Sequence, residues 1–160
     1  GPSGPFVHLG GRRPRGYGVH VRRLVKRRAR SRCEYCLIRG WPITVDHVIP
    51  RAEWLGSTRP DFAPDHPDNL AVACYECNVI GKRTRMRGVD PLSGTEVRLF
   101  HPRRQRWSDH FAWSADYLTL KGKTPTGWAT IEVLRLNGQR YRAQRRLLRL
   151  AMEAGARIWP

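Results

Sequence analysis

Cys33-Glu34-Tyr35-Cys36 and Cys74-Tyr75-Glu76-Cys77 contain every cysteine of this 160-residue chain and enclose the segment from which its architecture can be predicted. Two thiolates separated by two residues fit adjacent corners of a tetrahedral zinc site. Two such pairs, without a secretory signal, are typical of a metal site in a reducing compartment. We therefore expect a structural zinc on the four cysteines. The alternatives are a pair of disulfides, two unrelated buried pairs, or a rubredoxin-like iron site.

Between the cysteine pairs, the sequence predicts two strands and a helix. Residues 42–49 are rich in β-branched side chains, and residues 70–73 read as a second short strand. A helix is expected from Tyr75 to about Met86. Residues 51–68 contain one glycine and three prolines and predict a long loop, which in compact domains is usually functional or disordered.

The rest of the chain predicts an α+β protein with three parts. Residues 1–18 are rich in Gly, Pro and Arg and indicate a flexible basic arm. Residues 19–90 contain a helix over about 19–31 and the ββα core with its four-cysteine zinc site. Residues 91–160 form a C-terminal extension, in which we expect strands 95–100 and 117–121 to pair, followed by helices over 125–136 and up to about residue 154.

The charge favours a polyanionic partner. Thirty Lys and Arg residues against 13 Asp and Glu give a formal net charge of +17. Nucleic acid is the leading candidate because many dispersed cations release its bound counterions and so strengthen binding. An anionic membrane surface is the alternative partner. No apolar run approaches the roughly 20 residues that span a bilayer, and no signal peptide is evident. We expect a cytoplasmic protein, nucleoid-associated if bacterial, with no membrane partner.

Four polar residues lie between or directly behind the cysteine pairs: Asp46, His47, Asn69 and Asn78. Neighbours on a strand point to opposite faces, so Asp46 and His47 face one point only if the strand twists or ends there, which Pro50 favours. Asn78 lies four residues after a cysteine and shares its helical face.

The combination Cys33-x-x-Cys36, Asp46-His47-x-Ile49-Pro50-Arg51, Asp68-Asn69-Leu70 and Cys74-x-x-Cys77-Asn78-x-x-x-Lys82 resembles an HNH endonuclease of the zinc-containing ββα-metal type, over about residues 31–86. The resemblance implies a metal-dependent DNA endonuclease that hydrolyses phosphodiester bonds to 5′-phosphate and 3′-hydroxyl ends, by nicking or double-strand cleavage. The alternative is a zinc-stabilised nucleic-acid-binding module with an inactive HNH site.

The resemblance also implies residue roles. His47 would be the general base through one ring nitrogen, and Asn69 would accept a hydrogen bond from the other ring nitrogen of His47. Asp46 and Asn78 would ligate one Mg²⁺ or Mn²⁺ through oxygen. Arg51 and Lys82 are expected phosphate contacts, and the basic helix adds Arg22, Arg23 and Arg27 as nucleic-acid-binding residues. Double-stranded DNA is the expected partner, and the oligomeric state stays open, with a homodimer as one option.

Overall fold

The computed structural model describes residues 18–55 and 63–157. The predicted basic arm, apart from Gly18, and part of the predicted loop 51–68 lie outside the described residues. The helices and strands, in chain order, are α1 Val19–Arg28, β1 Ile43–His47, α2 Arg51–Leu55, the 3-10 turn η1 Pro67–Asn69, β2 Leu70–Cys74, the π-helix η2 Glu76–Lys82, β3 Arg87–Val89, β4 Glu96–Arg98, α3 Trp107–His110, β5 Phe111–Trp113, β6 Leu120–Gly122, α4 Pro125–Leu134 and α5 Gln139–Glu153.

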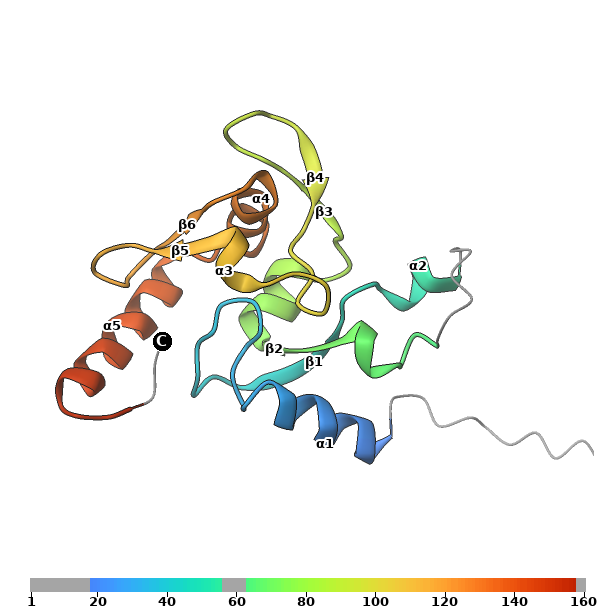
Figure 1. Cartoon of the computed structure of the whole chain (residues 1–160), viewed down its shortest axis with the longest axis horizontal. Coiled ribbons are helices and arrows are strands. Elements are labelled where there is room, and N and C mark those ends of the chain that lie inside the picture. The colour runs from blue at the N-terminus through green and yellow to red at the C-terminus, as the bar shows by residue number, and fades with distance from the viewer. Residues whose placement is uncertain (1–17, 56–62, 158–160) are drawn as a thin grey trace, which may run out of the picture.

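The centre of the site-bearing region is an antiparallel pair of strands between two helices. β1 pairs with β2 in a register that places His47 opposite Leu70 and Ile43 opposite Cys74. Leu70 and Val72 pack with α1 residues in one apolar cluster, whereas the small side chains of Ala71 and Ala73 belong to a second cluster on the other face. Because strand neighbours alternate between faces, α1 covers one face of the pair and η2 the other. Figure 1 shows α1 alongside the two strands.

The C-terminal extension packs directly on η2. A single buried cluster joins the four cysteines to apolar residues of α4 and α5, including Leu134, Tyr141 and Leu148. The backbones approach closely at Gly81, where a Cβ atom would lie 2.9 Å from Leu134 Cα. The extension therefore supports the helix that carries Cys77, Asn78 and Lys82.

The predicted α+β class, with small sheets and a four-cysteine cluster, is confirmed. The predicted pairing of 95–100 with 117–121 is wrong: β4 pairs with β3, and β6 pairs with β5. Both observed pairings close short loops, which cost less entropy than the longer connection we expected. The helix after the second cysteine pair ends at Lys82, where Arg83 has a φ of 54°. No helix of the described residues is long and apolar enough to cross a membrane.

Candidate metal centre and catalytic site

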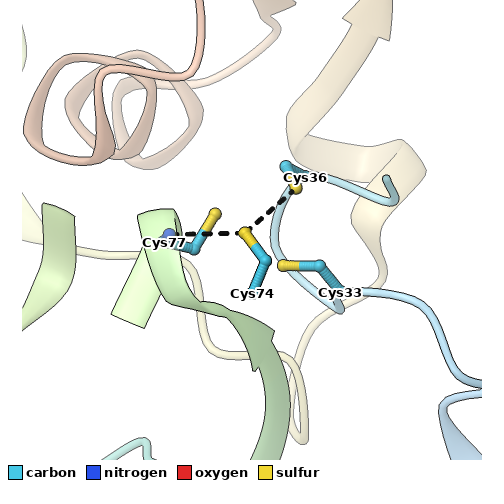
Figure 2. Close-up of side chains that lie close together, drawn as sticks. All are labelled: Cys33, Cys36, Cys74 and Cys77. Atoms are coloured by element: carbon cyan, nitrogen blue, oxygen red, sulfur yellow. Dashed lines mark hydrogen bonds between the residues drawn. The ribbon is translucent and has the colours of Figure 1, made fainter. Parts of the chain in front are cut away.

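The four cysteine side chains converge in one buried cluster. Their sulfur atoms all lie within 4.8 Å of one another, none is in a disulfide, and Cys36 Sγ and Cys74 Sγ are 3.8 Å apart. Figure 2 shows Cys33 and Cys36 reaching from the loop after α1 toward Cys74 and Cys77, at the end of β2 and the start of η2. A tetrahedron with zinc–sulfur distances of about 2.3 Å has edges of about 3.8 Å. The cluster is therefore suited to hold a metal ion such as zinc.

Local backbone bonds shape both cysteine pairs. In the first pair, the amide of Leu37 donates to the Cys33 carbonyl over 2.9 Å, and Leu37 adopts a left-handed φ of 60°. In the second, the Cys77 amide donates to Cys74 Sγ over 3.4 Å. Hydrogen bonds of this kind stabilise thiolate sulfur. Each pair is thus preorganised by its own turn before the fold brings the two together.

The electrostatics of the cluster favour a bound cation. Burial raises the pKa of the Cys36 and Cys77 thiols, which disfavours their ionised forms. Burial acts in the same direction on Cys33, but hydrogen bonds from the other three thiols outweigh it and lower the pKa of Cys33. A divalent ion is needed to compensate the charge of all four thiolates.

The cluster has a buried arginine close by. Arg145, on α5, is fully buried, and its guanidinium lies over the rings of Trp113 and Tyr141 at 5.3 and 5.6 Å. Burial lowers the pKa of Arg145, while the charges of Cys36 and Cys77 oppose that shift. Zinc with four thiolates would carry a net charge of −2, which this arginine would partly balance.

Asp46 points toward η2 and is enclosed. Its Oδ2 accepts a hydrogen bond from Tyr35 Oη at 2.6 Å, and its Oδ1 lies 3.1 Å from Lys82 Nζ. The Asp46 and Lys82 side chains are 3% and 2% exposed. Burial raises the pKa of the Asp46 carboxyl, although Lys82 and Tyr35 both act against the shift. The three side chains form a closed polar cluster beneath the strands.

Asn78 lies on the same side of β1 as Asp46. Its Nδ2 donates to Thr44 Oγ1 over 2.8 Å, and the Thr44 hydroxyl donates to the Ala73 carbonyl over 3.0 Å. Thr44 and Asp46 are two residues apart on the strand and share a face. Asp46 and Asn78 thus offer oxygen donors of the type that Mg²⁺ and Mn²⁺ prefer.

With Lys82 in this position, the arrangement nevertheless does not fit a divalent ion at Asp46. Both carboxylate oxygens are hydrogen-bonded, and the Lys82 ammonium stands where a second cation would be repelled. The prediction that Lys82 contacts phosphate is also not met in this geometry, because the side chain is buried and its Nζ donates to Asp46 and to the His47 carbonyl.

His47 points to the opposite face of β1 and meets a residue that the sequence did not single out. Its Nε2 lies 2.7 Å from Asp65 Oδ1, and the two side chains are 21% and 29% exposed. Arg51 engages both oxygens of the same carboxylate. Hydrogen bonds from Arg51 and, to a lesser extent, His47 hold the pKa of Asp65 below its usual range, against partial burial. Asp65 therefore stays ionised beside the imidazole at neutral pH.

The predicted hydrogen bond between Asn69 and the His47 ring is replaced by bonds to the backbone. Asn69 Oδ1 accepts from the Ile49 amide at 2.9 Å, while Nδ2 donates to the carbonyls of Ile49 and Pro64, both at 3.0 Å. Asn69 is 1% exposed. It joins the chain after β1 to the chain before η1, and so holds the segment that carries Asp65. The only signal for Asp65 in the sequence was its place in a long loop.

The predicted nucleic-acid contacts on α1 are accessible. Arg22, Arg23 and Arg27 are exposed, on the helix that covers the His47 face of the strands. The next residue, Arg28, turns back to the core and donates to the Leu70 carbonyl over 2.6 Å. α1 thus presents cations beside the strand pair that carries His47.

Comparison with known proteins agrees with this geometry. The family model of HNH endonucleases matches residues 33–83, which run from the first cysteine of the cluster to the residue after η2. The predicted family resemblance is confirmed for this part of the chain. No curated protein and no solved structure gives a significant match.

Proposed function

Because residues 33–83 form a segment of the HNH endonuclease family, we propose that this protein is a DNA endonuclease that hydrolyses phosphodiester bonds to 5′-phosphate and 3′-hydroxyl ends. The observation that carries the proposal is the partly exposed pair of Asp65 and His47, the last residue of β1, with Nε2 and Oδ1 2.7 Å apart. An imidazole oriented by an ionised carboxylate is suited to act as a general base near neutral pH.

In the proposed reaction, His47 donates its Nε2 proton to the hydrogen bond with Asp65, which fixes the tautomer in which Nδ1 is the basic nitrogen. Nδ1 takes a proton from the attacking water. The water oxygen forms a bond to phosphorus, the bond from phosphorus to the 3′ oxygen breaks, and the departing 3′ oxygen takes a proton from solvent to give the 3′-hydroxyl. His47 then returns its proton to solvent. Asp65 stabilises the imidazolium that results, as a positioning residue and not as a proton acceptor. Arg51, which holds Asp65, lies next to the base.

Asp46 and Asn78 remain our predicted ligands for Mg²⁺ or Mn²⁺. Such an ion would neutralise charge on the departing oxygen. Since Asp46 is paired with Lys82 in the structure, the ion could bind only after this ammonium moved.

The same ion pair favours the second candidate function, a zinc-stabilised DNA-binding module with an inactive site. In that case Lys82 would occupy the cation position permanently. Both candidates share double-stranded DNA as the partner, supported by the net charge of +17 and the exposed arginines of α1. We also infer an intracellular, reducing location from the four free thiols. For double-strand cleavage we infer a homodimer or two successive nicks, because one centre cuts one strand.

Plasmid nicking tests the proposal. The wild-type protein is incubated with supercoiled DNA in Mg²⁺, Mn²⁺ or EDTA, beside His47→Ala, Asp65→Asn and the control His20→Ala, which changes an exposed residue of α1. We expect nicking by the wild type and the control, loss of at least about 100-fold in His47→Ala, and a smaller loss in Asp65→Asn. DNA affinity of His47→Ala should stay within a few-fold of wild type. DNA binding by the wild type with no cleavage in any divalent ion would select the inactive module.

A further inference from the structure

A pocket lined by arginines lies between the end of α1 and the loop before α3. Its volume is about 400 Å³. Four arginines line it, together with a single carboxylate: Arg28, Arg30, Arg32, Arg103 and Glu34. The ring-bearing residues Phe100 and Trp107 complete the wall. The pocket thus joins the α1 region to the C-terminal extension, and neither His47 nor any of the four cysteines lines it.

The one carboxylate cannot neutralise this pocket. Glu34 Oε2 accepts a hydrogen bond from the Val72 amide at 2.7 Å, and Oε1 is paired with Arg103. The Arg28 guanidinium donates hydrogen bonds to the carbonyls of Pro67 and Leu70, at 3.2 and 2.6 Å. These neutral acceptors do not cancel its charge. Several positive charges therefore face the same space.

Burial and a neighbouring positive charge affect the pKa of one of these arginines. Burial, followed by the charge of Arg28, lowers the pKa of Arg103 to about 10. Arg103 Nε is buried and has no hydrogen-bond partner among the described residues. An anion in the pocket would relieve this repulsion and offer an acceptor to the guanidinium groups.

The backbone between α1 and the first cysteine pair adopts an unfavourable conformation that positions two of the arginines. Arg30 and Ser31 have φ values of 51° and 56°, a left-handed conformation that is uncommon outside glycine and asparagine. A hydrogen bond of 3.0 Å from Arg39 Nη1 to the Arg30 carbonyl supports the turn. Backbone strain of this kind persists where the surrounding structure imposes it, often at ligand sites. Here it brings Arg30 and Arg32 to the same pocket as Arg28.

We propose that this pocket binds a phosphate group of the nucleic-acid substrate, at a position away from the cleaved bond. The inference rests on the proposed function. Guanidinium groups bind phosphate through paired hydrogen bonds, so several converging arginines fit one tetrahedral anion. Arg28 is anchored to Leu70, which pairs with His47 at a strand spacing of roughly 5 Å. A DNA strand rising about 3.4 Å per nucleotide reaches from His47 to the pocket within a few nucleotides.

The test uses DNA binding in a background that does not cut. A duplex oligonucleotide is titrated by fluorescence anisotropy in EDTA with His47→Ala alone, with Arg30→Gln/Arg32→Gln added, or with Arg142→Gln/Arg146→Gln added. The last pair removes the same charge from exposed positions on α5. Arg28 and Arg103 are left unchanged because they hold Leu70 and Glu34. Melting temperature and zinc content confirm that each variant is folded.

We expect the pocket variant to weaken binding at least about 5-fold more than the α5 variant, and to reduce the slope of log affinity against log salt by about one. Equal losses in the two variants, or no loss in the pocket variant, would overturn the proposal. Duplexes with 5′-phosphate or 5′-hydroxyl ends identify the source: a pocket-dependent loss only with the phosphorylated end indicates a terminal phosphate, and a loss with both an internal one.

The two proposals fail separately. If wild-type protein never cuts DNA but the pocket variant still loses affinity, the endonuclease function is wrong and the phosphate pocket stands. If the protein cuts DNA and the pocket variant binds like the α5 variant, the pocket is wrong and the endonuclease function stands.

Discussion

Replacement of Lys82 by methionine should destabilise the fold through its buried partner, Asp46. The ammonium and the carboxylate are 3.1 Å apart, and both side chains are almost fully enclosed. Methionine fills a similar volume without the charge. The Asp46 carboxylate would keep its hydrogen bond from Tyr35 but lose the only cation that contacts it among the described residues. A buried carboxylate without its cation is strongly disfavoured.

The expected loss of folding stability depends on the pH. Removing one partner of a buried ion pair typically costs about 3–5 kcal/mol. Asp46 can escape part of that cost by taking up a proton. For a carboxyl with an unfolded pKa of about 3.9, protonation at pH 7 costs about 1.4 kcal/mol per pH unit, or about 4 kcal/mol in all. We therefore expect a loss of up to about 4 kcal/mol at pH 7, which corresponds to about 8–16 °C in melting temperature.

The sign of the pH dependence is a further part of the prediction. In the variant, the folded-state pKa of Asp46 lies above its unfolded value, so the folded state favours the protonated form. The penalty is absent below the unfolded pKa and grows as the pH rises toward the folded pKa. At pH 5 the loss should shrink to about 1.5 kcal/mol.

Urea denaturation at pH 7 and pH 5, with zinc held constant, measures these values. Lys121→Met, on an exposed surface, is the matched control and should change stability by less than about 0.5 kcal/mol. The double variant Asp46→Asn/Lys82→Met should recover most of the loss, because it removes both charges. If Lys82→Met is as stable as the control at pH 7, or if the double variant loses the sum of the two single losses, the buried pair does not exist in solution. Titration of each variant with Mn²⁺ shows whether the ammonium competes with a divalent ion.

Four further outcomes follow from the packing and the metal centre. Cys74→Ser should lose the bound zinc and most of the secondary structure, measured by metal analysis and circular dichroism, because binding of a structural metal is coupled to folding; retained zinc and normal melting would contradict the cluster. Gly81→Ala should cost about 1–3 kcal/mol, since the added Cβ would lie 2.9 Å from backbone, whereas Gly18→Ala, with nothing within 4 Å, should melt like wild type. Arg145→Met should release zinc at a lower chelator concentration, because a positive charge beside the thiolates is lost; unchanged release would show that the arginine only packs. Asn69→Ala should cost about 1–3 kcal/mol in urea denaturation, because its buried side chain bonds three partly buried backbone groups; a loss of cleavage with unchanged stability would instead restore its predicted role at the imidazole.

The local chemistry of the site could be predicted from single motifs. The Cys-x-x-Cys spacing predicted the cluster because each pair closes its own turn, and the β-branched run predicted the strand that carries Asp46 and His47. The alternation rule for strands also holds, since these neighbours face opposite sides of β1. The predicted strand pairing of the extension was wrong, because several short strands are compatible with one pattern and the loop closures decide among them.

The sequence by itself determined the two strands and the start of the following helix within residues 33–83, and which four thiols meet, because turn chemistry and side-chain periodicity are local properties. Its net charge favours a polyanionic partner. Only the tertiary structure decided the partners of each polar group. It paired Asp46 with Lys82, His47 with Asp65, and Asn69 with backbone, since each pair joins segments that no local rule relates. It also brought Arg103 next to Arg28, Arg30 and Arg32, because the pocket forms only where the loop before α3 packs against the end of α1.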